Sequence, residues 1–170
     1  MINVPLADKG VADANRAHEF LSSQPIERVI SSPLCRAVRT AEIICPNLCI
    51  EQNNGLFPWS IPTYWGKSKD EFDEAIEGFI KTPSKTPPMG ESLNDFMDRT
   101  GDFFEDQLNE HCMTLFVAHT TNIIAFCDLC DGTQNHDKVI QPGGVIGIYC
   151  KEDGDGYGYK ILLGKDTKAD

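Results

Sequence analysis

Positive charge is scarce in this chain. It has 15 lysines and arginines against 26 aspartates and glutamates, a formal net charge of −11 at pH 7. Binding to a nucleic-acid backbone needs a basic face, so this balance argues against a nucleic-acid partner. The sequence also lacks any apolar run near the roughly 20 residues of a membrane-spanning helix, and its first residues do not have the pattern of a signal peptide. We therefore expect a cytoplasmic protein that binds neither nucleic acid nor membranes.

The sequence also lacks paired cysteine motifs. Its seven cysteines are an odd number, and most lie in apolar runs, which is typical of reduced core residues in a cytosolic protein. Cys127-Asp128-Leu129-Cys130 is a lone Cys-x-x-Cys, whereas a zinc site needs a second pair. We expect a structural role for these cysteines, with no metal and no cofactor. The residues expected in the core are Cys45, Cys49, Cys112, Cys127 and Cys150.

The length of 170 residues and the 41% hydrophobic content suit one domain spanning 1–170, and no repeat or linker divides it. Apolar residues recur at helical or strand spacing along most of the chain. This alternation predicts an α/β fold, a three-layer sandwich with a mostly parallel central sheet. Helices are predicted at 8–22, 36–44, 69–80, 91–108 and 120–129, and strands at 28–30, 48–51 and 113–118, with a hairpin at 144–150 and 157–163.

Two polar residues directly follow predicted buried strands. Arg36 lies in the first turn of the helix after one strand, and His119 ends the run Leu115-Phe116-Val117-Ala118. Ligands of open α/β sheets bind outside the carboxyl ends of the strands, so both side chains should lie on that rim. An arginine beside a helix N-terminus presents a bidentate fork where an anion is already favoured. We expect Arg36 and His119 to bind one anion together.

Several motifs in order carry a family resemblance. Residues 31–42 read Ser-Ser-Pro-Leu-Cys-Arg-Ala-Val-Arg-Thr-Ala-Glu, preceded by Pro-Leu and a glycine at 5–10 and followed by Gly-Glu-Ser at 90–92 and the strand ending in His119. The pattern resembles the histidine phosphatase (phosphoglycerate mutase-like) superfamily over nearly the whole chain. The resemblance implies a phosphoglycerate mutase-like fold and a phosphatase or mutase. The expected partner is a small phosphorylated molecule, and no metal is required.

The resemblance also implies roles for particular residues. Arg36 corresponds to a phosphate ligand and His119 to the second active-site histidine. Thr120 stands where the family usually has glycine, and its hydroxyl is expected either to bind phosphate or to cap the next helix. Trp59 and Tyr64 lie in a loop similar to the one that carries the family's general acid, and they either line a substrate pocket or pack the loop. The Gly-Glu-Ser at 90–92 is interpreted as a helix start.

Two departures from the family pattern limit what the resemblance implies. Pro58 stands where many members have the acidic glutamate, and Arg-His-Gly, the nucleophile motif of the family's first strand, occurs nowhere in the sequence. We expect that the full-length form works through a phosphohistidine intermediate and that this chain is shortened or impaired. The alternative is an inactive pseudo-phosphatase that binds a phosphorylated ligand. A homo-oligomer is left open.

The absence of the family's first strand, which carries Arg-His-Gly, leads to an expectation about folding. We expect its place to be inside the sheet, between the strand that leads to Ser31 and the strand that leads to His119. Removing it would leave unpaired backbone groups in a buried sheet. The chain should then be unstable alone, close the gap by rearranged pairing, or borrow a strand from another polypeptide.

Overall fold

The computed structural model describes residues 3–64, 66–108, 112–132, 140–152 and 156–164, and every structural statement below refers to these residues. Within these ranges, no helix combines the length and the apolar character needed to cross a membrane. Strands and helices alternate up to α5, except that α3 and α4 follow each other, and the described elements end in a hairpin, as the sequence pattern predicts.

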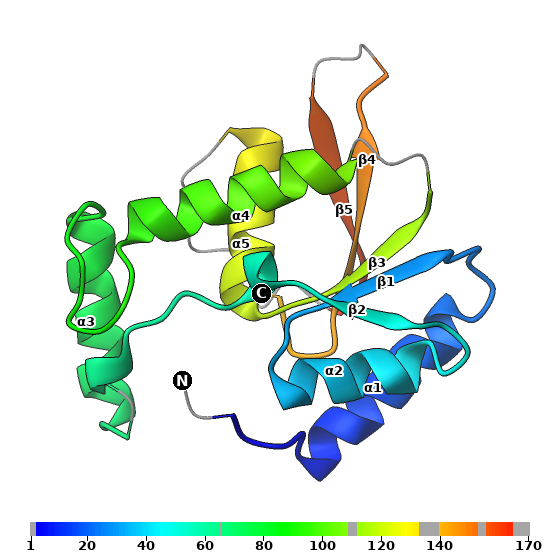
Figure 1. The fold of residues 1–170 in the computed structure, drawn as a ribbon, viewed down its shortest axis with the longest axis horizontal. Helices are drawn as coiled ribbons and strands as arrows, with labels where there is room; N and C mark the ends of the chain where they lie inside the picture. Colours follow the sequence, from blue (N-terminus) through cyan, green and yellow to red (C-terminus); the bar gives the residue numbers. More distant parts are fainter. Residues whose placement is uncertain (1–2, 65, 109–111, 133–139, 153–155, 165–170) are drawn as a thin grey trace.

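The main sheet consists of three parallel strands in the order β2-β1-β3. In the centre, Val29 pairs with Ile50 on one side and with Leu115 on the other. Two further strands form a separate antiparallel hairpin, which stands beyond β3 in Figure 1. The strands are β1 (Arg28–Ser31), β2 (Ile50–Gln52), β3 (Thr114–Val117), β4 (Val145–Cys150) and β5 (Tyr157–Leu163).

Helices cover both faces of the main sheet, which gives three layers (Figure 1). Helix α2, with α1 packed beside it, covers one face, and α4 with α5 covers the other. Helix α3 lies next to the loop that leads to α4, and two 3-10 turns shape the segment after β2. The helices are α1 (Asp8–Leu21), α2 (Cys35–Ile44), α3 (Lys69–Lys81), α4 (Leu93–Leu108) and α5 (Thr120–Asp131), and the 3-10 turns are η1 (Asn54–Leu56) and η2 (Pro62–Tyr64).

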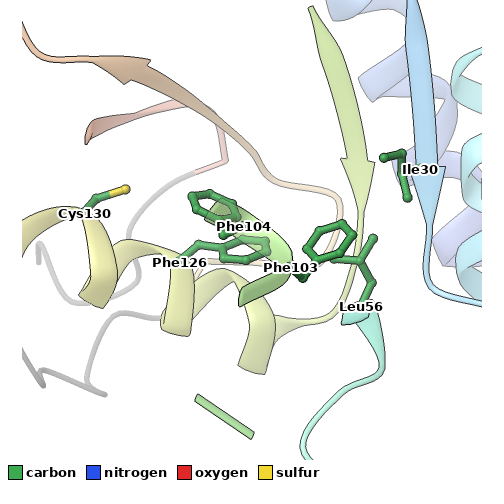
Figure 2. Packing of buried hydrophobic residues seen from close by; sticks show 6 residues of the cluster. All are labelled: Ile30, Leu56, Phe103, Phe104, Phe126 and Cys130. Carbon is green, nitrogen blue, oxygen red and sulfur yellow. The ribbon is translucent and has the colours of Figure 1, made fainter. Parts of the chain in front are cut away.

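Strand β1 is buried on both faces. Successive side chains of a strand point to opposite faces, so Val29 packs against α2 while Ile30 joins the aromatic cluster under α4 and α5. Figure 2 shows this second cluster, in which the rings of Phe104 and Phe126 stack at 3.8 Å between centroids. Burying each such side chain contributes about 1.5–3 kcal/mol. The core therefore fixes the position of β1, whose end leads into the candidate site.

Most predicted elements agree with the observed ones to within two residues, and the hairpin is confirmed. The expected location of the lacking strand is wrong, because β1 and β3 pair directly along their whole length, from Arg28 with Thr114 to Ser31 with Val117. No gap separates them. The expectation for the cysteines is also partly wrong, because Cys49 and Cys150 are exposed, whereas Cys127 is buried. Cys49 directly precedes β2, and Cys150 is the last residue of β4.

Candidate functional site

The ends of β1 and β3 meet at one edge of the sheet. Ser31 pairs with Val117, and the Ser32 amide donates a hydrogen bond of 2.9 Å to the Val117 carbonyl. Each strand then leads into a helix, β1 into α2 and β3 into α5. Two helix N-termini therefore follow neighbouring parallel strands, as expected for a ligand site in an α/β fold.

His119 is held at this edge by two hydrogen-bonding partners. Its Nε2 lies 2.9 Å from Oγ of Ser32, which is fully buried. Its backbone amide donates to Oδ1 of Asn122 at 3.3 Å, and the Asn122 side-chain amide donates to the Phe57 carbonyl at 3.0 Å. Asn122 is fully buried as well. The imidazole is thus fixed between the end of β1 and the start of α5.

The protonation state of His119 follows from its surroundings. Burial, and after it the positive charge of Arg36, lowers the pKa of His119 from 6.5 to about 4. Both causes disfavour the imidazolium cation. At neutral pH the ring is therefore uncharged, and it presents one N–H donor and one acceptor.

Arg36 differs from the other arginines of the chain. The sequence has five arginines, and four of them form ion pairs with a carboxylate. Among the residues that the structure describes, no carboxylate pairs with Arg36. The side chain lies in the first turn of α2 and, with His119 and Thr120, lines a cavity of about 980 Å³. Its guanidinium is available to bind an anion, since no described carboxylate competes for it.

The two threonines after His119 have different surroundings. Thr120 is exposed and lines the cavity beside His119. Thr121 Oγ1 accepts a hydrogen bond of 3.3 Å from the Trp59 amide, so it holds the 57–60 loop against α5. Thr120 is the first residue of α5, and a phosphate contact by its hydroxyl stays a prediction.

Trp59 and Tyr64, the two expected pocket residues of the loop, lie away from this cavity. Both pack edge-on against Phe79 of α3, with ring centroids 6.4 and 6.2 Å apart, respectively. The Trp59 indole donates to the Glu91 carbonyl at 3.1 Å. Neither residue lines the cavity of Arg36 and His119. The structure gives both rings a packing role, and their substrate-binding role stays a prediction; Trp65 lies outside the described residues.

The Gly-Glu-Ser segment at 90–92 begins α4, as interpreted from the sequence. Asp95 donates its amide to Oγ of Ser92 and accepts from the same hydroxyl through its carboxylate, which forms an N-terminal cap. Glu91 pairs with Arg99 at 2.7 Å. Arg99 in turn binds the carbonyls of the preceding loop, at Asn54, Gly55 and Phe57.

Sequence reasoning assigned no role to Ser32 or Asn122. The positions of both residues in the sequence nevertheless indicate a role. Ser32 is the second residue after the apolar run Val29-Ile30, and Asn122 lies three residues after His119, where a side chain reaches back to the preceding backbone. The remaining described histidine, His18, donates from Nδ1 to the Ile44 carbonyl at 2.7 Å and joins two helices. His111 and His136 lie outside the described residues.

Comparisons with known proteins give a consistent result. The family described as "Histidine phosphatase superfamily (branch 1)" matches residues 1–149. A search of curated protein sequences gives no significant match. Similar solved structures include a phosphoserine phosphatase from Entamoeba histolytica in complex with 3-phosphoglyceric acid. It has a TM-score of 0.78 and 17% identity, with 98% of this chain and 86% of that chain covered.

Two further structures extend the comparison. A mycobacterial glucosyl-3-phosphoglycerate phosphatase in complex with VO3 has a TM-score of 0.78 and 16% identity, with 95% of this chain and 87% of that chain covered. A protein from Thermus thermophilus has a TM-score of 0.64 and 24% identity, with 85% of this chain and 78% of that chain covered. At these identities the likeness establishes the phosphoglycerate mutase-like fold.

Proposed function

Because the chain belongs to the histidine phosphatase superfamily, we propose that its site binds the phosphoryl group of a small phosphorylated molecule and that the full-length form hydrolyses phosphomonoesters. One observation carries the proposal: Arg36, the arginine without a carboxylate partner among the described residues, lines the same cavity as the partly buried, neutral His119. The two similar phosphatases, whose complexes hold 3-phosphoglyceric acid or VO3, support the same substrate class.

Each residue of the site makes a different contact with the phosphoryl group. The Arg36 guanidinium binds two phosphoryl oxygens through its parallel N–H groups. The N-termini of α2 and α5 add backbone N–H groups and their dipoles. His119 and the Thr120 hydroxyl supply further hydrogen bonds as negative charge develops on the transferred group. None of these contacts needs a metal ion.

The sequence contains no motif that identifies the nucleophile of this reaction. In the proposed reaction a histidine attacks phosphorus, the alcohol leaves, and water then hydrolyses the phosphohistidine to release phosphate. The sequence contains no Arg-His-Gly to supply that histidine, and Pro58 stands where a glutamate would act as general acid. Nε2 of His119 is engaged in a hydrogen bond of 2.9 Å with the buried Ser32 hydroxyl.

This departure from the family pattern favours a second candidate, a protein that binds a phosphorylated ligand without turnover. The reading frame upstream of Met1 separates the two. An in-frame Arg-His-Gly there supports the hydrolase, whereas a stop codon directly before Met1 supports the binding protein. For either candidate, the odd number of cysteines, most of them in apolar runs, supports a reducing, cytoplasmic compartment.

The anion site is tested by titrating the protein with orthovanadate and inorganic phosphate in a calorimeter. We expect Arg36→Ala to weaken anion binding about 10-fold to 100-fold, the loss of a charge-assisted hydrogen bond of about 1.5–3 kcal/mol. Arg39→Ala is the matched control, because Arg39 lies on the same helix and pairs with Glu42 at 3.0 Å. Equal affinity in both variants would contradict the proposed site.

A further inference from the structure

All three guanidinium nitrogens of Arg99 donate hydrogen bonds. Nη1 and Nη2 donate to carbonyls of the loop that follows β2, those of Asn54, Gly55 and Phe57, at 2.9–3.2 Å. Nε and Nη2 donate to the two carboxylate oxygens of Glu91, at 3.2 and 2.7 Å. Arg99 lies in α4, which this loop passes on its way to α3 (Figure 1). The side chain therefore ties the loop after β2 to the start of α4.

The Phe57 carbonyl joins this contact to the candidate site. It accepts hydrogen bonds from Nη1 and Nη2 of Arg99, both at 3.2 Å, and from the Asn122 side chain at 3.0 Å. A carbonyl oxygen has two lone pairs, so the guanidinium and the Asn122 amide together saturate it. Hydrogen bonds from a charged donor are about twice as strong as those between neutral groups. Arg99 thus fixes the acceptor on which the Asn122 amide depends.

Asn122 carries the connection to His119. Its side-chain nitrogen donates to Phe57, so its side-chain oxygen points the other way and accepts from the His119 amide at 3.3 Å. The two ends of an amide have nearly the same shape, so the hydrogen-bond partners decide which way it points. A displaced Phe57 carbonyl would leave the donor of the fully buried Asn122 unpaired and release the amide. The backbone of His119 would then lose the bond that fixes it.

A second set of contacts holds the same loop against α5. The Trp59 amide donates to Oγ1 of Thr121 at 3.3 Å, and the Trp59 indole donates to the Glu91 carbonyl at 3.1 Å. The Glu91 amide in turn donates to the Ser60 carbonyl at 3.3 Å. Residues 57–60 are therefore fixed between the start of α4 and the first turn of α5.

We propose that Arg99 is a positioning residue of the anion site. It acts on His119 through the Phe57 carbonyl, which orients Asn122. The inference rests on the proposed function, because it concerns the same site. Groups that bind a ligand must be held within about 0.5 Å of the productive geometry, and this chain of hydrogen bonds holds the start of α5 beside the anion. Lysine cannot replace Arg99, since a single ammonium is a point charge that cannot reach the loop carbonyls and both Glu91 oxygens together.

The test compares Arg99→Lys with Arg28→Lys. Arg28 is the matched control, because it also binds both oxygens of a carboxylate, that of Glu51 at 2.8 and 2.7 Å, at the end of β1 away from the site. Both variants should melt at a lower temperature than wild type. Only Arg99→Lys should shift the NMR resonances of the His119 amide and ring in the unliganded protein. It should also weaken orthovanadate binding, measured by calorimetry, about 5-fold to 30-fold, a coupling of the size typical between linked sites.

A double-mutant cycle shows whether Arg99 acts through Asn122. Asn122→Ala removes the connection, so Arg99→Lys should add no further loss of vanadate affinity on that background. A second measurement needs no variant. In wild type, one side-chain amide proton of Asn122 should exchange with solvent at least about 10-fold more slowly than in a free amide, because it is bonded to the Phe57 carbonyl.

Three results would overturn the proposal. Identical His119 resonances in Arg99→Lys and wild type would show that Arg99 supports only the fold. Additive losses in the cycle would show that Arg99 acts by another route. Free exchange of both Asn122 side-chain protons would show that the Phe57 carbonyl does not hold the amide. A wild-type chain that binds neither vanadate nor phosphate would contradict the proposed function instead, and the His119 resonances would still decide the role of Arg99.

Discussion

The imidazole Nε2 of His119 lies 2.9 Å from the hydroxyl oxygen of Ser32, a contact between residues 87 positions apart. Ser32 also accepts from the Leu34 amide at 3.4 Å and donates its own amide to Val117. One buried serine therefore joins the ends of both strands to the histidine of the site. This connection, and the site that it supports, can be tested in solution.

Ser32→Ala should lower the free energy of unfolding by about 1–3 kcal/mol, because a buried hydrogen-bonding group loses its partner. It should also change the NMR shifts of the His119 ring and weaken vanadate binding. Ser31→Ala is the matched control, since its hydroxyl is equally buried and donates to the Ser32 carbonyl instead. The control should lose stability without a change in the His119 ring. Identical ring shifts in wild type and Ser32→Ala would refute the link.

The depressed pKa of His119 predicts a specific loss of stability in acid. The folded-state pKa is about 4 and the ordinary value is 6.5. Between these pH values the unfolded chain binds a proton that the folded chain does not. The contribution of the neutral His119 ring to the free energy of unfolding is therefore complete above pH 6.5 and is lost as the pH falls towards 4. The shift corresponds to at most about 3 kcal/mol. Denaturant titrations should show a shallower pH dependence in this window for His119→Asn than for wild type.

Phosphate binding should raise the pKa of His119. An anion beside the ring favours the imidazolium, and it also neutralises Arg36, the second cause of the depression. The ring resonances, followed by NMR across the acidic and neutral pH range, should titrate at higher pH with saturating phosphate than without it. By linkage, phosphate should bind more tightly as the pH falls through this range. A titration curve that phosphate leaves unchanged would place the anion elsewhere.

The 170-residue chain should have negligible activity on p-nitrophenyl phosphate, because it contains no imidazole positioned by an Arg-His-Gly strand. His119 can contribute only charge stabilisation. Rapid quench followed by mass spectrometry should find no phosphohistidine. A stoichiometric burst with the phosphoryl group on His119 would show that this histidine is the nucleophile.

Much of this architecture could be predicted from the sequence, for identifiable physical reasons. Strong periodicity indicated the helices at 8–22 and 69–80, and strand-to-helix junctions placed Arg36 and His119 on one edge of the sheet. The order of strands could not be predicted. Periodicity reports which faces of a strand are buried but not which strand is its neighbour, so the direct pairing of β1 with β3 is visible only in the structure.

The loop residues show a second limit of sequence reasoning. Trp59 and Tyr64 fit a pocket wall and a packed loop equally well, because both environments favour aromatic rings. Their contact with Phe79 depends on where α3 lies, and that is a tertiary property. The hydrogen bond between Ser32 and His119 is a tertiary property as well, since the two residues are 87 positions apart in the sequence.

The parallel pairing of β1 has a consequence for the order of events during synthesis. β2 is translated soon after β1, but β3 begins 62 residues after β2 ends, from Gln52 to Thr114. At about 5–20 residues per second, the ribosome needs roughly 3–12 s to reach it. During that interval the edge of β1 that β3 will cover stays open, next to the apolar Val29 and Ile30. The nascent chain is therefore most exposed to aggregation, and most suited to chaperone binding, while α3 and α4 are being made.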